Sequence, residues 1–241
     1  MLHTRPYRET SLLLELFTRE QGRLAAVARG ARGRRPRWGS ALRAFGELGL
    51  AWHGRGELAS LGAAEPLGPW PLPVGRRLAC ALYLNEVLVR LLRRDDPHPE
   101  LFDSYREAVR ALAQGSVAEA VVLRVFERDL LAAAGYGLQL LQDASGQPLD
   151  PAGWYCYRPE HGPVPWEPAP GRAEPGPRLR GEALLALAAG CPDAAAAGGE
   201  LRALTRAALQ PHLGERPLKS RELYAGMLRS QPGAGQRGEP Q

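Results

Sequence analysis

The residues whose types and spacing best suit a functional site are five arginines within nine positions near the N-terminus. They are Arg29, Arg32, Arg34, Arg35 and Arg37, in the stretch VARGARGRRPRWG. No acidic residue lies between Glu20 and Glu47 to neutralise them. Guanidinium groups bind phosphate oxygens through paired, charge-assisted hydrogen bonds. Gly30 and Gly33 allow the stretch to bend and Pro36 stiffens its far end, so we expect an arched loop that follows a row of phosphates.

Three neighbouring residues can extend this surface. Trp38 directly follows the run, where its ring can stack on a nucleobase. Arg19 and Arg23, on either side of the preceding turn, can lengthen a groove for a nucleic-acid backbone. Two alternatives stay open: a solvated loop whose arginines bind nothing in particular, and a Trp38 that packs on the domain beneath it.

The spacing of the residues does not indicate a catalytic site or a metal site. The chain contains no GxxxxGK[ST] phosphate loop, no HExxH motif and no GxSxG motif. Its five histidines lie far apart in the sequence, and its three cysteines include no CxxC pair. Asp95 and Asp96 precede Pro97, a context typical of a turn at the end of a helix. We therefore expect no enzyme, no cofactor, no metal ion and no disulfide framework.

The excess of positive over negative charge is confined to the first third of the chain. Residues 1–70 contain 11 Arg and 6 Glu, which accounts for the whole formal net charge of +5. A local excess of this kind favours a polyanionic partner. No run approaches the roughly 20 apolar residues that span a bilayer, and MLHTRPYRET lacks the apolar segment of a signal peptide. We therefore expect a cytoplasmic protein without membrane contact.

The elements that must position the arginines are short strands. The apolar run Leu12–Phe17, the turn around Gly22 and the run Leu24–Ala28 predict a β-hairpin that ends where the basic stretch begins. FGELGLAW, HGRGE and Leu58–Leu61 predict a strand, a turn and another strand. Four or five short strands are typical of a small barrel, such as the five-stranded oligonucleotide-binding (OB) fold, which holds nucleic acid on one face and in its loops.

Helical periodicity follows, in three segments with apolar residues three and four positions apart. These segments cover residues 76–94, 98–115 and 116–135. Ser116 and Glu119 have the spacing of a capping box, and Gly135 can end the third helix in the left-handed conformation. Short connections predict antiparallel packing into a bundle. Further helices are expected over residues 179–189, 200–209 and 216–229.

A proline-rich segment interrupts the helical pattern. Residues 142–178 contain nine prolines and five glycines, but also Trp154, Tyr155, Tyr157 and Trp166. Disordered segments are poor in aromatic residues. We therefore expect a loop or an irregular hairpin that packs partly on the bundle.

Together these patterns predict an α+β protein with two domains and a tail. An N-terminal five-stranded OB-fold barrel is expected over residues 1–72. A mainly α-helical C-terminal domain, with the proline-rich insertion, is expected over residues 73–229. Residues 230–241 contain nothing to bury and are expected to form a flexible tail.

Several motifs, in the same order along the chain, resemble the RecO family of bacterial recombination mediators. They are LHTRPYRETSLLLELFTREQGRLAAVARGARGRR, GRGELASLGAAEP, LYLNEVLVRLL, LRVFERDLLAAAGYG and PHLGERPLKSREL. The resemblance covers nearly the whole chain. It is closest to the proteobacterial branch, because other branches carry a four-cysteine zinc site after the GYG element and this chain has GYGLQLLQDASGQPLDPAGWYCY there. Family members also have several residues before the LHTRP segment, so we expect either a shortened first strand or a start upstream of Met1.

The resemblance implies the same two domains and a role in recombinational repair, in the cytoplasm on the nucleoid. It implies a protein that binds single- and double-stranded DNA, anneals complementary strands and, with RecR, helps to load RecA onto strands coated by single-stranded-DNA-binding protein (SSB). It also implies recognition of the acidic, phenylalanine-ended SSB tail by the helical domain. Carried onto this sequence, Arg124 is expected to pair with the tail carboxylate, with Leu112 and Leu130 as apolar neighbours. The alternative for Arg124 is a helix-surface arginine paired with Glu127 or Asp129.

Three other function classes stay open from the residues alone. The main alternative is an RNA-binding or ribosome-associated OB-fold protein, which competition of RNA against single-stranded DNA would separate. A nucleic-acid-modifying enzyme would show turnover with added metal and nucleotide. An adaptor that binds only proteins would show no salt-dependent affinity for DNA.

Overall fold

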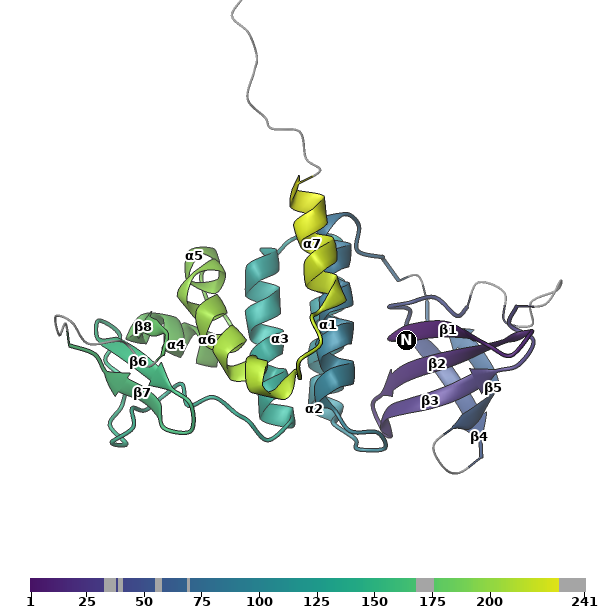
Figure 1. The fold of residues 1–241 in the computed structure, drawn as a ribbon, viewed down its shortest axis with the longest axis horizontal. Helices are drawn as coiled ribbons and strands as arrows, with labels where there is room; N and C mark the ends of the chain where they lie inside the picture. Colours follow the sequence, from purple (N-terminus) through teal and green to yellow (C-terminus); the bar gives the residue numbers. More distant parts are fainter. Residues whose placement is uncertain (33–37, 39–40, 55–57, 69, 168–175, 230–241) are drawn as a thin grey trace, which may run out of the picture.

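The computed structural model describes residues 1–32, 38, 41–54, 58–68, 70–167 and 176–229 of the 241-residue chain. Three bodies lie in a row in Figure 1: a five-stranded sheet, a group of long helices, and a small sheet with short helices. Five strands followed by a mainly helical region confirm the predicted fold class. None of the helices in these ranges is long and apolar enough to cross a membrane.

The first sheet has the strand order of an OB fold. Its strands are β1 (His3–Tyr7), β2 (Ser11–Thr18), β3 (Gly22–Ala28), β4 (Leu48–His53) and β5 (Ala59–Pro66). The spatial order is β1-β2-β3-β5-β4, with β3 and β5 parallel and every other pair antiparallel. Among the described residues no ladder joins β4 to β1, so the sheet is OB-like but is not the closed barrel expected from the sequence. β1 has only five residues, and its Pro6 has no N–H to donate along that edge.

The predicted hairpin is confirmed: β2 and β3 pair along their length, with Leu12 opposite Ala28 at one end and Thr18 opposite Gly22 at the other. Gly22 has a φ of +65°, and a Cβ there would lie 1.9 Å from the carbonyl oxygen of Asp96 in the helical region. The position therefore accepts only glycine, both for its backbone angle and for its close contact with a distant segment.

Three long helices form the centre of the molecule (Figure 1). They are α1 (Arg76–Leu91), α2 (Pro99–Gln114) and α3 (Glu119–Ala133). The predicted capping box is wrong: the residue before α3 is Ala118, and no side chain caps the helix, because Ser116 lies outside it. Gly135, with a φ of +85°, follows the end of α3 as predicted, and its N–H donates to the carbonyl oxygen of Ala132.

The proline-rich segment forms a hairpin, as expected, and a third strand completes a small sheet. Its strands are β6 (Trp154–Arg158), β7 (Gly162–Pro165) and β8 (Arg178–Arg180), in the order β7-β6-β8. It does not pack chiefly on the three-helix bundle. It instead forms a second hydrophobic core together with the short helices that follow. This core includes Tyr155, Tyr157 and Leu179 of the small sheet, and Leu184 and Leu201 of the helices. The aromatic residues of the segment therefore form the interior of a separate small body.

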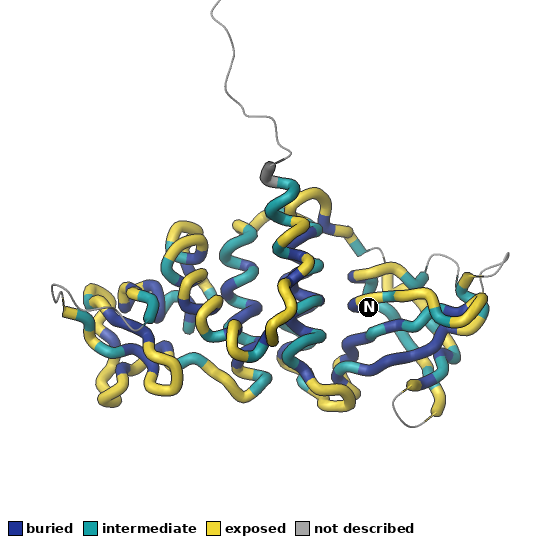
Figure 2. The backbone as a smooth tube through the Cα atoms, in the orientation of Figure 1, coloured by how far each residue is buried: buried dark blue, intermediate teal, exposed yellow. Residues whose placement is uncertain are grey.

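The last helices return the chain to α1. They are α4 (Gly181–Ala188), α5 (Ala194–Gly198), α6 (Glu200–Leu209), the 3₁₀ turn η1 (Gln210–His212) and α7 (Lys219–Arg229). The helix α7 lies along α1 in Figure 1. Figure 2 shows buried backbone along the inner strands and the facing sides of the helices. The tail predicted over residues 230–241 lies outside the described residues.

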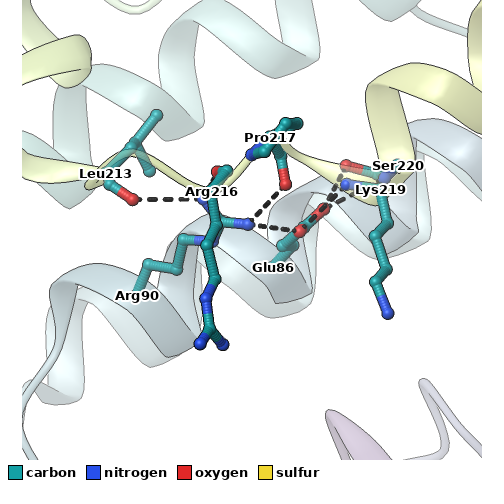
Figure 3. A network of polar contacts seen from close by, with 7 residues as sticks. All are labelled: Glu86, Arg90, Leu213, Arg216, Pro217, Lys219 and Ser220. Atoms are coloured by element: carbon teal, nitrogen blue, oxygen red, sulfur yellow. Dashed lines mark hydrogen bonds and ion pairs between the residues drawn. The ribbon is translucent and has the colours of Figure 1, made fainter.

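A polar network fixes the start of α7 (Figure 3). The carboxylate of Glu86, on α1, accepts hydrogen bonds from the N–H groups of Lys219 and Ser220, at 3.1 and 3.0 Å, and from the Ser220 hydroxyl at 2.7 Å. One turn further on, Arg90 donates to the carbonyl oxygens of Leu213, Arg216 and Pro217. Glu86 therefore caps a helix that begins more than 130 residues later in the chain.

Candidate nucleic-acid interface

The first sheet has one face toward its own core and one face outward. Leu14 and Leu16 of β2 pack with Leu24, Ala26 and Leu61 in the core of the sheet. Because side chains alternate along a strand, the residues between them lie on the outer face. On β2 and β3 these outer residues are Ser11, Leu13, Glu15, Phe17, Arg23, Ala25 and Val27.

One end of the outer face docks on the helical bundle. The ring of Phe17 lies 5.6 Å from that of Phe102 and 6.0 Å from that of Tyr105, both on α2. The amide of Asn85, on α1, donates to the carbonyl oxygen of Leu2 at 2.7 Å and accepts from the Tyr105 hydroxyl at 2.6 Å. Apolar contact and satisfied buried polar groups together bind the sheet firmly to α1 and α2.

Two predicted groove residues, Arg19 and Arg23, lie at this docked end. Arg23 donates to the carbonyl oxygen of Val89 at 2.6 Å and lies 3.4 Å from the carboxylate of Glu15. Burial lowers the pKa of the Arg23 guanidinium, while Glu15 opposes the shift. Arg19 is exposed and pairs with Asp103 of α2 at 3.1 Å. The structure thus directs both arginines toward the helical domain.

The other end of the outer face is open. It forms a hollow of about 370 Å³. Its lining consists of Tyr7, Arg8, Ser11, Val27, Arg29, Leu58, Ala59 and Ser60. Arg29 and Arg23 lie at opposite ends of β3, which at about 3.3 Å per residue are roughly 20 Å apart. The predicted cations therefore fall into two groups, one on the open surface and one at the domain junction.

The basic loop leaves the sheet at this open end. Arg29 and Arg32 are exposed, and the N–H of Arg32 donates to the carbonyl oxygen of Thr10 at 2.9 Å, which joins the loop to the β1–β2 turn. Three further predicted members, Arg34, Arg35 and Arg37, lie outside the described residues. The part of the loop that is described thus starts beside the hollow.

Trp38 lies at the far end of the same loop. Its indole N–H donates to the carbonyl oxygen of Arg29 at 3.1 Å, and its partly buried ring packs against the core of the sheet. Trp38 therefore packs on the domain beneath it, which was one of the two alternatives for this residue. Stacking of Trp38 on a nucleobase stays a prediction.

Sequence reasoning missed Tyr7 and Arg8. Tyr7 ends β1 and Arg8 begins the turn to β2. The Arg8 guanidinium carbon lies 5.3 Å from the centre of the Tyr7 ring. An aromatic residue next to an arginine, at a strand end of a basic OB domain, was the available signal.

The three residues expected to bind the SSB tail are all buried in the helical domain. Leu112 and Leu130 are 1 and 0 % exposed and belong to the bundle core. Arg124 is 5 % exposed, and its guanidinium forms an ion pair of 2.7 Å with Glu127 one turn later. Glu127 also accepts a hydrogen bond of 2.6 Å from the Tyr83 hydroxyl. Of the two alternatives for Arg124, the structure shows pairing with Glu127, in the interior of the bundle.

The described part of the chain contains no group of three or more His, Cys, Asp or Glu placed to hold a metal ion. Cys80 and Cys156 are buried and Cys191 is exposed. Burial raises the pKa of Cys80 to about 12, so its thiol stays protonated at neutral pH.

Comparison with known proteins matches both halves of the chain. Residues 1–70 fit the family model "Recombination protein O N terminal", and residues 73–222 fit "Recombination protein O C terminal". The chain is 48 % identical to the DNA repair protein RecO of Alkalilimnicola ehrlichii, over 95 % of this chain and 90 % of the relative. It is 44 % identical to the RecO of Nitrosococcus oceani, over 95 and 92 % of the two chains. For the RecO of Halorhodospira halophila the identity is 42 %, over 94 and 95 %.

Proposed function

Because the chain belongs to the RecO family of DNA repair proteins, we propose that it binds DNA at the open end of its first sheet and anneals complementary strands there. With RecR, it would assist the loading of RecA onto SSB-coated single strands. This work takes place in the cytoplasm on the nucleoid and requires no catalytic centre and no cofactor.

The placement of the cations is the observation that carries the proposal. The docked end of the outer face pairs its arginines with Glu15 and Asp103, whereas the open end presents Arg8, Arg29 and Arg32 to solvent. Single- and double-stranded DNA share the phosphate backbone, so such a surface binds both. We include Arg34, Arg35 and Arg37 in it on the grounds of sequence alone.

Charge neutralisation explains how annealing can proceed without hydrolysis. Two strands repel each other through their rows of phosphates. A strand held by its phosphates on a basic surface has lost part of that charge and still offers its bases to a partner. Each neutralised phosphate also releases counterions, so the affinity must fall steeply with salt.

Recruitment to SSB-coated DNA is the second part of the proposal. The expected contact is between the SSB tail carboxylate and Arg124, with Leu112 and Leu130 nearby. Since Glu127 already pairs with Arg124, the tail carboxylate would have to take the place of that side chain. Tethering through the tail raises the local protein concentration at the DNA without a need for high intrinsic affinity.

The test is the salt dependence of DNA binding by the combined Arg32→Ala, Arg34→Ala and Arg35→Ala variant. Loss of three phosphate contacts should weaken binding to oligo(dT) and lower the log–log salt slope by roughly 2, at about 0.7 per contact. The matched control replaces Arg158, Arg202 and Arg206, three exposed arginines far from the first sheet, with alanine. Equal losses in both variants, or a wild-type affinity that does not respond to salt, would contradict the proposal. Preferential binding of RNA in competition would favour the RNA-binding alternative.

A further inference from the structure

The hollow at the open end of the first sheet is built from three separate segments. Tyr7 and Arg8 come from the end of β1 and the turn after it, and Val27 and Arg29 from the end of β3. Ser60 comes from β5, opposite Val27 in the parallel pair. The outer-face register thus brings an aromatic ring, two guanidinium groups and two serine side chains around one space.

The chemistry of the lining fits one unit of a nucleic-acid strand. Tyr7 supplies a flat apolar ring, and Val27 and Leu58 supply apolar walls. Arg8 and Arg29 supply positive charge, and no acidic residue belongs to the lining as described. Glu9 is the neighbour of Arg8 in the chain and is itself exposed. At about 370 Å³, the space falls within the range of roughly 300–1,000 Å³ that small-ligand sites occupy.

The Arg8 guanidinium occupies the position over the Tyr7 ring where a base would stack. Its carbon atom lies 5.3 Å from the ring centre. Arg8 also has a φ of +50°, a left-handed backbone angle that is uncommon for a residue other than glycine. With this backbone angle Arg8 lines the hollow. The guanidinium group can leave the Tyr7 ring and bind a phosphate instead, which frees the ring for a base.

We propose that Tyr7 stacks on one unpaired base while Arg8 and Arg29 hold the adjacent phosphates, so that Tyr7 makes this surface favour single strands over duplex. The inference rests on the proposed function, since it requires that DNA binds at this face. In the interior of a duplex both faces of each base are covered by stacked neighbours, so the Tyr7 ring cannot stack there, whereas the phosphates stay accessible. The arginines therefore act on both forms of DNA, and the ring acts on unpaired strands alone.

The experiment compares Tyr7→Leu with Tyr7→Phe, which keeps the aromatic ring. Affinity is measured by fluorescence anisotropy for three probes of equal length: oligo(dT), an oligomer with abasic sites in place of the bases, and a duplex. Tyr7→Leu should weaken oligo(dT) binding about fivefold or more, the lower limit for one base–aromatic stack. Binding of the abasic oligomer and the duplex should stay within about twofold of wild type, and Tyr7→Phe should behave as wild type on all three probes.

The outcomes separate this inference from the proposed function. If Tyr7→Leu loses affinity equally for all three probes, or for none of them, the ring does not contact a base and the inference falls. In either case a wild-type protein with steeply salt-dependent binding still supports DNA binding at the basic surface. Thermal unfolding of each variant, followed by circular dichroism, shows that the compared proteins are folded.

Discussion

Arg23 of β3 lies 3.4 Å from the carboxylate of Glu15 of β2, where the first sheet meets the end of α1. The two side chains are only 14 and 15 % exposed, and Arg94 approaches the same carboxylate at 2.9 Å. One glutamate thus compensates two arginines at the domain junction. This arrangement leaves little of the Arg23 side chain exposed and ties the sheet to the helical bundle.

Removing the shared carboxylate should weaken the junction. Glu15→Ala leaves Arg23 largely buried without an acidic partner, and we expect it to lower the free energy of unfolding by about 2 kcal/mol. Urea denaturation followed by circular dichroism measures the change. Glu107→Ala, at a glutamate whose side chain is 71 % exposed, is the control and should change the stability by less than about 0.5 kcal/mol. A Glu15→Ala variant as stable as this control would show that the junction does not depend on the ion pair.

The cap that Glu86 provides to α7 should depend on pH. Burial alone would raise the pKa of Glu86, but hydrogen bonds from Ser220 and Lys219 and the charge of Arg90 bring it below its usual value. A carboxyl group whose pKa is lowered by folding stabilises the protein fully above its unfolded pKa of about 4.3, and loses that contribution as pH falls through the folded value.

Glu86→Gln should therefore cost about 1 kcal/mol of stability at pH 7, because the amide cannot replace the charged cap. The difference from wild type should shrink as the pH falls below the unfolded pKa of about 4.3, because the unfolded chain then takes up a proton at Glu86 more readily than the folded protein does. Glu107→Gln serves as the exposed counterpart. A wild-type to Glu86→Gln difference that is the same at pH 7 and pH 3.5 would contradict the assignment of the cap to the ionised carboxylate.

Substitutions in the buried pair Arg124–Glu127 should affect two properties that can be measured separately, the stability of the protein and its affinity for the SSB tail. Arg124→Ala leaves Glu127 in the interior with only the Tyr83 hydroxyl as a described partner, and we expect a loss of about 3 kcal/mol in stability. If the SSB tail exchanges places with Glu127, then Glu127→Gln should strengthen binding of a labelled tail peptide and Arg124→Ala should abolish it. A peptide with an amidated C-terminus lacks the carboxylate and should bind neither protein. Unchanged peptide affinity in a folded Arg124→Ala variant would leave Arg124 with a structural role alone.

The small sheet carries an arginine that contacts two neighbouring tryptophan rings. The guanidinium carbon of Arg178 lies 5.0 Å from the ring centre of Trp154 and 4.6 Å from that of Trp166. We expect Arg178→Ala to destabilise this body by about 1 kcal/mol, as for two exposed cation–π contacts, and Arg178→Lys to lose less. Tryptophan fluorescence during urea unfolding, to which both rings contribute among the five tryptophans of the chain, follows the transition. Arg158→Ala, an exposed arginine of the neighbouring β6, should have no comparable effect.

The sequence by itself determined most of the strands and helices and the class of the fold. The apolar runs Leu12–Phe17 and Leu24–Ala28 and the apolar spacings of three and four after Arg76 are local patterns, since each follows from the geometry of one strand or helix. The cluster of arginines between Arg29 and Arg37 is also visible in the sequence, because charged residues can be counted without knowledge of the fold. The capping box failed because helix starts are set by the packing of the whole helix as well as by local residues.

Only the tertiary structure decided which residues share a surface. The docking of Phe17 on α2 covers one end of the outer face. Arg23 is largely buried there, and the exposed Arg19 pairs with Asp103. The parallel pairing of β3 with β5 places Ser60 beside Val27 and completes the hollow next to Tyr7. The burial of Arg124 likewise depends on α5 and α1, which supply the Ala197 carbonyl and the Tyr83 hydroxyl around the Arg124–Glu127 pair. Such contacts join segments far apart in the chain, and local periodicity carries no information about them, because it records only which side of its own element a residue occupies.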